Sequence, residues 1–284
     1  MPDKTKDRRL IELKYRIMWR IGTVIAFLLY FSGIMAIYTF VRWRCFKQYI
    51  AIVLMYHRVG DNSHEPDMTV SNSNFDCQMR YIKENYKISS LDEILDLYIS
   101  GSTLTEDTIA ITFDDGHRDN YINAYPILRK YDIPASIFVA INFVGQPFGL
   151  TKEEILTMRK DKITFGAHTM THRVLADLDK HSASLEIKGS KSALEQILGE
   201  DVKYFAYPYG LRGRDFTVES VQIVRETGFT AAFTTNNGYI DRSNDIFMLK
   251  RIGVRNIPLF VLKCRLSGIF ENRFIHILRR CAGV

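Results

Sequence analysis

The strongest constraint on the fold is an alternation, between residues 50 and 258, of short β-rich runs with segments of helical periodicity. Such an alternation is typical of repeated β-α units. We predict strands over Ala51–Tyr56, Thr108–Phe113, Ala135–Ala140, Ile163–Ala167, Tyr204–Tyr207 and Thr230–Thr234. The helical segments are Ser182–Leu198, which has the clearest apolar face, and Phe75–Tyr86, Leu91–Ile99, Asn120–Tyr131 and Thr217–Thr227. No repeat or linker interrupts them, so we predict one α/β domain, a (β/α) barrel.

Four of the predicted strands end in residues that can carry chemistry. These are Tyr56 with His57, Asp114 with Asp115, His168, and the run from Tyr207 to Tyr209. In α/β barrels the carboxyl ends of the strands share one face, and that face holds the active site. We therefore expect these distant residues to lie together.

The aspartate pair stands at a strand end and is followed by Gly116. Neighbouring strand residues point to opposite sides, so Asp114 and Asp115 can have different tasks, one on a metal and one on a water molecule. Asp-Gly is also a common turn signal, so the pair alone does not establish a site.

Two histidines, His168 and His172, are four residues apart. Imidazole is a favoured ligand of divalent first-row metals, although a lone pair of this spacing is often incidental. Together with Asp115 the pair forms a His, His, carboxylate set, which leaves metal positions open for water and substrate, as in hydrolytic zinc sites. The combination is far more specific than either half.

Three motifs, ITFDDG, GAHTMTH and FAYPYG, follow one another in this order. The region from about residue 50 to 256 thereby resembles the polysaccharide deacetylase family, whose catalytic module is the NodB homology domain of carbohydrate esterase family 4. The resemblance implies a distorted barrel and hydrolysis of N-acetyl, sometimes O-acetyl, groups on a glycan. It assigns Asp114 as general base and Asp115, His168 and His172 as ligands of one divalent ion, usually Zn²⁺. It further implies that the backbone N–H of Tyr209 stabilises the oxyanion, although Tyr-Pro-Tyr-Gly is also a rigid turn.

The sequence departs from the family pattern in two places. Many members have an arginine where this chain has Ala206, and Arg251 is a candidate replacement that would orient the base. No late Leu-x-His motif follows residue 235; instead His57 ends the early run Val53–His57. This order resembles the subgroup that deacetylates poly-N-acetylglucosamine, and it makes His57 the expected acid for the leaving amine. A structural histidine is the alternative. The remaining histidines receive no catalytic role: His64, His117, His181 and His276.

Residues 21–41 carry no charged side chain, over about the length needed to cross a bilayer. A cleaved signal peptide is the alternative, but the stretch exceeds a usual signal core. Seven basic residues precede the segment and three follow it, which by the positive-inside rule leaves the amino terminus cytoplasmic and the large domain outside. We predict a single-pass protein of the cell membrane with an extracytoplasmic catalytic domain.

The net charge of +6 is unevenly distributed. Residues 1–47 hold ten Lys/Arg and three Asp/Glu, and residues 259–284 hold five basic residues and Glu271, so the region between them is acidic. A nucleic-acid-binding domain would have the basic residues on its folded part, so we predict no nucleic-acid partner. The carboxyl-terminal tail, residues 259–284, has the composition of a basic amphipathic helix that lies on the domain or on an anionic membrane, or of a solvated terminal helix.

The predicted organisation is a cytoplasmic segment over 1–20, a transmembrane anchor over 21–41, a linker over 42–49, the catalytic domain over 50–258 and the tail over 259–284. The cysteines lack zinc-finger spacing, and a bond between Cys264 and Cys281 stays open. The predicted function is removal of N-acetyl groups from an extracytoplasmic polysaccharide, with synthesis or export machinery as a possible partner. The alternatives are a catalytically silent glycan-binding or scaffold protein and a two-carboxylate glycosidase, which would leave both histidines unexplained.

Overall fold

The computed structural model describes residues 20–61, 64–241 and 243–270. The chain divides into two compact units, one from the described parts of Met1–Gln48 and Pro258–Val284 and one from Tyr49–Ile257. The predicted cytoplasmic segment, except Arg20, and the tail beyond Phe270, with Cys281, lie outside the described residues.

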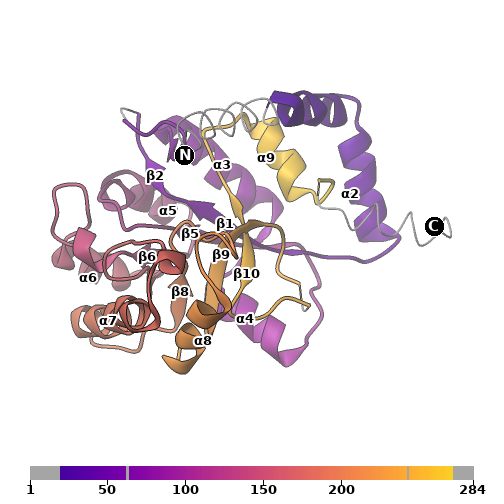
Figure 1. The fold of residues 1–284 in the computed structure, drawn as a ribbon. Helices are drawn as coiled ribbons and strands as arrows, with labels where there is room; N and C mark the ends of the chain where they lie inside the picture. Colours follow the sequence, from indigo (N-terminus) through magenta and orange to yellow (C-terminus); the bar gives the residue numbers. More distant parts are fainter. Residues whose placement is uncertain (1–19, 62–63, 242, 271–284) are drawn as a thin grey trace, which may run out of the picture. The chain divides into compact units, whose positions relative to one another are not determined.

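The larger unit is a closed barrel of parallel strands in the order β1-β10-β9-β8-β7-β6-β5 (Figure 1). The barrel closes where β1 pairs with β5, in register from Ala51 with Thr108 to Tyr56 with Phe113. The seven strands are β1 (Ala51–Tyr56), β5 (Thr108–Phe113), β6 (Ala135–Val139), β7 (Ile163–Ala167), β8 (Tyr204–Ala206), β9 (Ala231–Asn237) and β10 (Leu249–Gly253). The predicted barrel fold is therefore confirmed.

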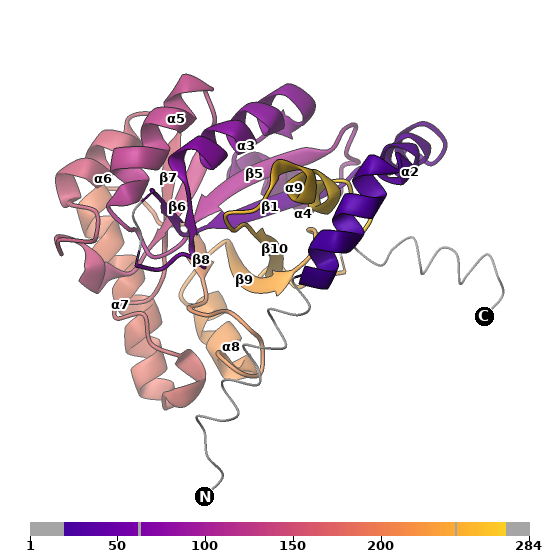
Figure 2. The ribbon, with the colours of Figure 1, turned by 90° about the horizontal axis from the view of Figure 1, so that it is seen from above.

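Helices surround the strands (Figure 2). They are α3 (Asn72–Asn85), α4 (Leu91–Ser100), a π-helix η1 (Asn120–Ala124), α5 (Tyr125–Lys130), a 3₁₀-helix η2 (Ile141–Phe143), α6 (Lys152–Arg159), a 3₁₀-helix η3 (Leu175–Asp177), α7 (Lys180–Leu198) and α8 (Val218–Glu226). Serine or threonine caps start several of them; Ser90 and Thr151, for example, bond Glu93 and Glu154 in capping boxes.

Several short elements were not predicted. Helix α6 is short and polar, with a weak apolar pattern. Three strands have two residues each, too few to show alternation: β2 (Arg58–Val59), β3 (Thr69–Val70) and β4 (Lys87–Ile88). Strand β4 pairs with the first residues of β5, and β2 pairs with β3 in a separate sheet.

The barrel interior is filled by side chains, and helix α4 contributes to it. Leu91, Ile94 and Leu95 of α4 belong to the same buried cluster as Val53 of β1 and Phe233 of β9. Tyr204 at the start of β8 donates a hydrogen bond to Asp92 of α4. Helix α4 therefore covers the interior at the amino end of the strands, and the carboxyl end is left for other side chains.

In the smaller unit, residues 20–44 form two helices instead of the one expected over 21–41. A helix over Arg20–Phe31 and α2 (Ile34–Arg44) are bent by 71° at the break between them. Gly33, which precedes α2, has φ 77°, a conformation that glycine adopts without the penalty other residues incur. Among the described residues no single helix is long and apolar enough to cross a membrane, whereas this bent pair together meets the criteria of length and composition.

Candidate active site

The predicted site residues meet at the carboxyl end of the barrel strands. His57 follows β1, Asp114 and Asp115 follow β5, and His168 follows β7. Parallel strands that are neighbours in a closed barrel end on the same face, which brings together residues more than 100 positions apart. The expectation drawn from the strand ends is therefore confirmed for these positions.

Asp115, His168 and His172 form a candidate metal centre. Their ligand atoms all lie within 4.8 Å of one another. Asp115 Oδ1 is 3.4 Å from His168 Nε2 and 3.0 Å from His172 Nε2. A tetrahedral ion with bonds of about 2.1 Å has ligand atoms about 3.4 Å apart, so the spacing fits such an ion. Asp115 Oδ1 is also buried without a hydrogen-bond partner among the described residues, which a bound cation would explain.

Each histidine ligand is oriented by its surroundings. The Nδ1 atom of His168 lies 2.7 Å from the carbonyl oxygen of Ala206, so a proton on Nδ1 would leave the Nε2 lone pair free for a metal. The loop that carries His172 is held by Glu186 of α7, whose carboxylate accepts hydrogen bonds from the N–H and hydroxyl of Thr171. Glu186 therefore positions the second histidine ligand from a distance.

His117 holds the other oxygen of Asp115. Its Nε2 atom is 3.2 Å from Asp115 Oδ2, and both side chains are almost fully buried. Burial alone would raise the pKa of Asp115, but the neighbouring imidazoles of His117, His168 and His172 hold that pKa well below its ordinary value. This arrangement fixes Oδ2 and leaves Oδ1 facing His168 and His172. From the sequence, His117 received no catalytic role, and its positioning role was missed.

Asp114 is paired with Arg251 inside the barrel. The Arg251 guanidinium donates two hydrogen bonds of 2.7 Å, one to each carboxylate oxygen of Asp114. The Arg251 side chain is fully buried. Burial would raise the pKa of Asp114, but the charge of Arg251 overcomes that effect and lowers it. Asp114 is therefore held ionised and in one orientation.

Arg251 reaches Asp114 from β10, two strands away around the barrel. The register between β9 and β10 shifts between Leu249 and Arg251, and such irregularities re-aim a side chain. The guanidinium lies over the rings of Phe138 and Phe233, and its Nε donates to the Thr234 carbonyl. Ala206, where many family members have an arginine, is the last residue of β8 and fully buried. The structure thus supplies a guanidinium to Asp114 from another strand, as the sequence suggested.

His57 lies beside both aspartates. Burial lowers the pKa of His57, whereas the negative charges of Asp115 and Asp114 raise it in part. Its backbone carbonyl accepts a 2.8 Å hydrogen bond from the side chain of Asn120, in the π-helix η1. The segment after β5 thereby fixes the residue after β1, in keeping with the frequent use of π-turns at functional sites.

Backbone strain is concentrated at the same end of the barrel. Asp115, Thr169, His172 and Tyr209 have φ values of 75°, 65°, 57° and 60°, and they are four of the six described non-glycine residues with positive φ. Each such residue costs about 1 to 3 kcal/mol and persists only where the surroundings enforce it. At Tyr209 the backbone N–H makes no hydrogen bond to any described residue, so it is free to bind a ligand.

The comparisons with known proteins agree with this geometry. Residues 101–232 match the family model described as polysaccharide deacetylase. This range contains Asp114, the three metal-site residues and Tyr209. The match therefore shows a polysaccharide deacetylase domain over these residues.

Several proteins that are named as deacetylases or resemble one in structure match most of this chain. It is 27% identical over 257 residues to the poly-β-1,6-N-acetyl-D-glucosamine N-deacetylase of Staphylococcus aureus (strain N315), covering 80% of this chain and 86% of the relative. The Streptococcus pyogenes deacetylase PplD, solved in complex with acetate, has a TM-score of 0.70 and 28% identity, covering 76% of this chain and 98% of that chain. IcaB from Ammonifex degensii has a TM-score of 0.68 and 26% identity, covering 78% and 97%.

Two of the predicted site residues of the deacetylase, His57 and Arg251, lie outside the range of the family match. Their placement therefore rests on the geometry of this chain. His117 and Glu186 lie inside the range, but no short motif marks them. Their proximity to the ligands depends on how loops and helices pack, so a sequence pattern gave no signal for them.

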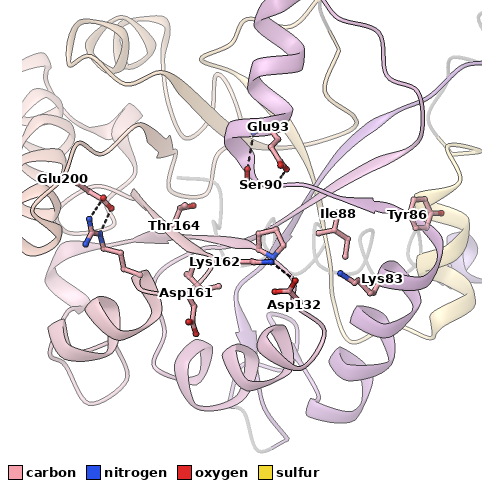
Figure 3. A pocket seen from close by; sticks show the side chains of 13 residues that line it. Lys83, Tyr86, Ile88, Ser90, Glu93, Asp132, Asp161, Lys162, Thr164 and Glu200 are labelled. Atoms are coloured by element: carbon pink, nitrogen blue, oxygen red, sulfur yellow. Dashed lines mark hydrogen bonds and ion pairs between the residues drawn. The ribbon is translucent and has the colours of Figure 1, made fainter.

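A cavity of about 800 Å³ opens at the other end of the deacetylase barrel (Figure 3). It is lined by residues near the amino end of the barrel, among them Ile88 of β4 and Thr164 of β7, and by none of the predicted site residues. Its charged side chains form ion pairs, such as Lys162 with Asp132 and Arg159 with Glu200. This cavity is not the candidate active site.

Proposed function

We propose that this chain hydrolyses N-acetyl groups of a polysaccharide, with one divalent ion held by Asp115, His168 and His172. The observation that carries the proposal is the convergence of these three ligands beside Asp114, which Arg251 holds ionised. We propose Zn²⁺ as the ion, because two imidazoles and one carboxylate with open positions suit hydrolytic zinc. Bound there, it would acidify a water molecule and polarise the acetyl carbonyl.

The residues of the chain then take separate tasks in the reaction. Asp114 takes a proton from the attacking water as the water oxygen bonds to the acetyl carbon. The N–H of Tyr209 donates to the carbonyl oxygen as negative charge develops on it. His57 donates a proton to the sugar nitrogen as the carbon–nitrogen bond breaks, which yields acetate and a free amine. Arg251 keeps the carboxylate of Asp114 ionised and in one orientation.

The substrate class is supported by the relatives and by the surface around the ligands. The Staphylococcus aureus relative is named for poly-β-1,6-N-acetyl-D-glucosamine, and PplD was solved with acetate, the acid that deacetylation releases. The rings of Phe148 and Tyr209 are about half exposed, and Tyr209 lies 5.0 Å from the ring of His172. Exposed aromatic faces next to a hydrolytic centre suit sugar rings, and we propose β-1,6-linked N-acetylglucosamine chains as substrate.

The location is proposed from the amino-terminal helices. Ten large apolar side chains of residues 21–46 are more than 40% exposed, which the core helix of a water-soluble protein would not show. We propose that this region holds the protein at the cell membrane, with the barrel extracytoplasmic, where it meets a polymer and the machinery that makes or exports it.

The direct test is acetate release from N-acetylglucosamine oligomers by the purified full-length chain in detergent. Asp114→Asn should lower turnover by about 10²- to 10⁴-fold, as removal of a general base does, while the chain still binds about one ion. The ion content is measured by elemental analysis. Full activity of Asp114→Asn would refute its role as base. A wild type that binds oligomers without releasing acetate would instead support a silent glycan-binding protein.

A further inference from the structure

The smaller unit has the surface of a lipid-embedded structure. Its described residues, 20–48 and 258–270, contain six basic side chains and no acidic one. Large apolar side chains exposed by 42 to 64% run along its two amino-terminal helices: Ile21, Val24, Ile25, Phe27, Leu28, Phe31, Ile34, Ile37 and Phe40. Apolar faces rimmed by basic residues fit acyl chains below anionic headgroups.

The carboxyl-terminal helix α9 (Leu259–Leu266) is packed into this same unit. The ring of Phe260 lies 6.1 Å from that of Phe27 and 5.9 Å from that of Phe31. The ammonium group of Lys263 lies over the ring of Tyr30, 5.4 Å from its centre. The α9 side chains therefore pack on the helix over Arg20–Phe31, the first limb of the bent pair; α2 is its second limb.

The carboxyl-terminal segment contacts both limbs of the bent pair. Cys264 Sγ lies 3.4 Å from the carbonyl oxygen of Ala26 in the first helix. The hydroxyl of Tyr38 in α2 donates to the carbonyl of Gly268, just beyond α9. One short segment thus contacts both sides of the break at Gly33, which would hold the two limbs in their bent arrangement.

We propose that Pro258–Phe270 is embedded in the bilayer together with residues 20–48, so that the barrel is tethered to the membrane at both of its chain ends. The inference rests on the proposed membrane location and not on the proposed reaction. The connections are short: residues 45–50 join α2 to β1, and residues 254–258 join β10 to α9. Since β1 and β10 are neighbouring strands, two such connections would restrict rotation of the barrel more than a single tether.

Fluorescence quenching in vesicles tests this proposal on the full-length chain. The two native tryptophans, Trp19 and Trp43, are replaced by phenylalanine, and one tryptophan is introduced at a time. Phe260→Trp reports on α9, Phe27→Trp on the first limb, and Val218→Trp on an exposed position of the barrel. The vesicles contain phosphatidylcholine and phosphatidylglycerol, with or without bromine atoms on the acyl chains.

The expected result is loss of fluorescence in brominated vesicles for both Phe260→Trp and Phe27→Trp, and no loss for Val218→Trp. Quenching of Phe27→Trp alone would overturn the proposal and leave the amino-terminal anchor intact. Quenching of neither would overturn the membrane location as well, and would point to a second copy of the chain as the cover of the apolar faces. Acetate release, measured on the same variants, reports separately on the proposed reaction.

A cross-link gives a second measurement that does not depend on lipid. In a chain with Cys45, Cys77 and Cys281 changed to serine, Ala26→Cys should form a disulfide with native Cys264 within one chain on oxidation with copper phenanthroline, since the two residues are buried in contact with each other. Val24→Cys, on an exposed face of the same helix, is the matched control and should not react. Equal reaction of both variants, or of neither, would contradict the packing of α9 on the first limb.

Discussion

The two ends of the barrel are both rich in charge, yet they differ in how that charge is arranged. At the amino end, Lys162, Asp132, Arg159 and Glu200 form simple ion pairs around an open cavity. At the carboxyl end, Asp114 and Asp115 are buried, and Asp115 Oδ1 lacks a hydrogen-bond partner among the described residues. Paired, solvated charges contribute little free energy, whereas a buried and incompletely paired set is costly to build and marks a functional site.

The largest effect is expected from loss of the metal. Treatment with a chelator, or His172→Ala, should lower acetate release by at least about 10³-fold, since the ion both activates water and polarises the carbonyl. Elemental analysis and reactivation by added Zn²⁺ check this result, with the exposed His181→Ala as the matched control. Unchanged turnover in a chain shown to be free of metal would mean that the buried charges at the carboxyl end do not mark a metal-dependent site.

The next largest effect concerns the pair of Arg251 and Asp114. Arg251→Met should reduce the free energy of unfolding by about 3 to 5 kcal/mol, because it leaves a buried carboxylate without its partner. Denaturant unfolding measures the loss. The double variant Asp114→Asn with Arg251→Met should recover part of the stability but no turnover. Failure of the second change to recover stability would show that Arg251 acts through packing on Phe138 and Phe233 instead.

A smaller effect is expected at His117. His117→Phe keeps the ring but loses the donor to Asp115 Oδ2, and should weaken metal binding by about 10- to 100-fold, as loss of such partners does. Competition with a metal-binding dye measures the affinity. His117→Gln can still donate and should bind metal more tightly than His117→Phe. Equal affinity of the phenylalanine variant and the wild type would refute the positioning role.

The smallest effect is expected at the amino end. Lys162→Ala removes the pair with Asp132, in which both side chains are more than half exposed, and should change stability by no more than about 1 kcal/mol. Turnover and metal affinity should not change. A loss of turnover comparable to that of His117→Phe would show that the cavity of Figure 3 influences the reaction.

Much of the barrel could be predicted because its signals are local. The runs Ala51–Tyr56, Thr108–Phe113 and Ile163–Ala167 coincide with β1, β5 and β7, since uninterrupted β-rich runs are properties of neighbouring residues. Helix α6 and the two-residue strands were missed, because too few residues carry their pattern. The single helix expected over 21–41 is two helices in the structure; composition gives the apolar length of the region but not the bend near Gly33.

The sequence by itself determined the kind of fold, the candidate ligand set Asp115, His168 and His172, and the resemblance to polysaccharide deacetylases, because short motifs at strand ends carry that information. It suggested Arg251 and His57 without being able to place them. Only the tertiary structure decided that Arg251 hydrogen-bonds Asp114, that His117 contacts the carboxylate of Asp115, and that α9 packs on the amino-terminal helices. These contacts join residues of different strands, loops and helices, and strand order and packing, not local pattern, bring such residues within bonding distance.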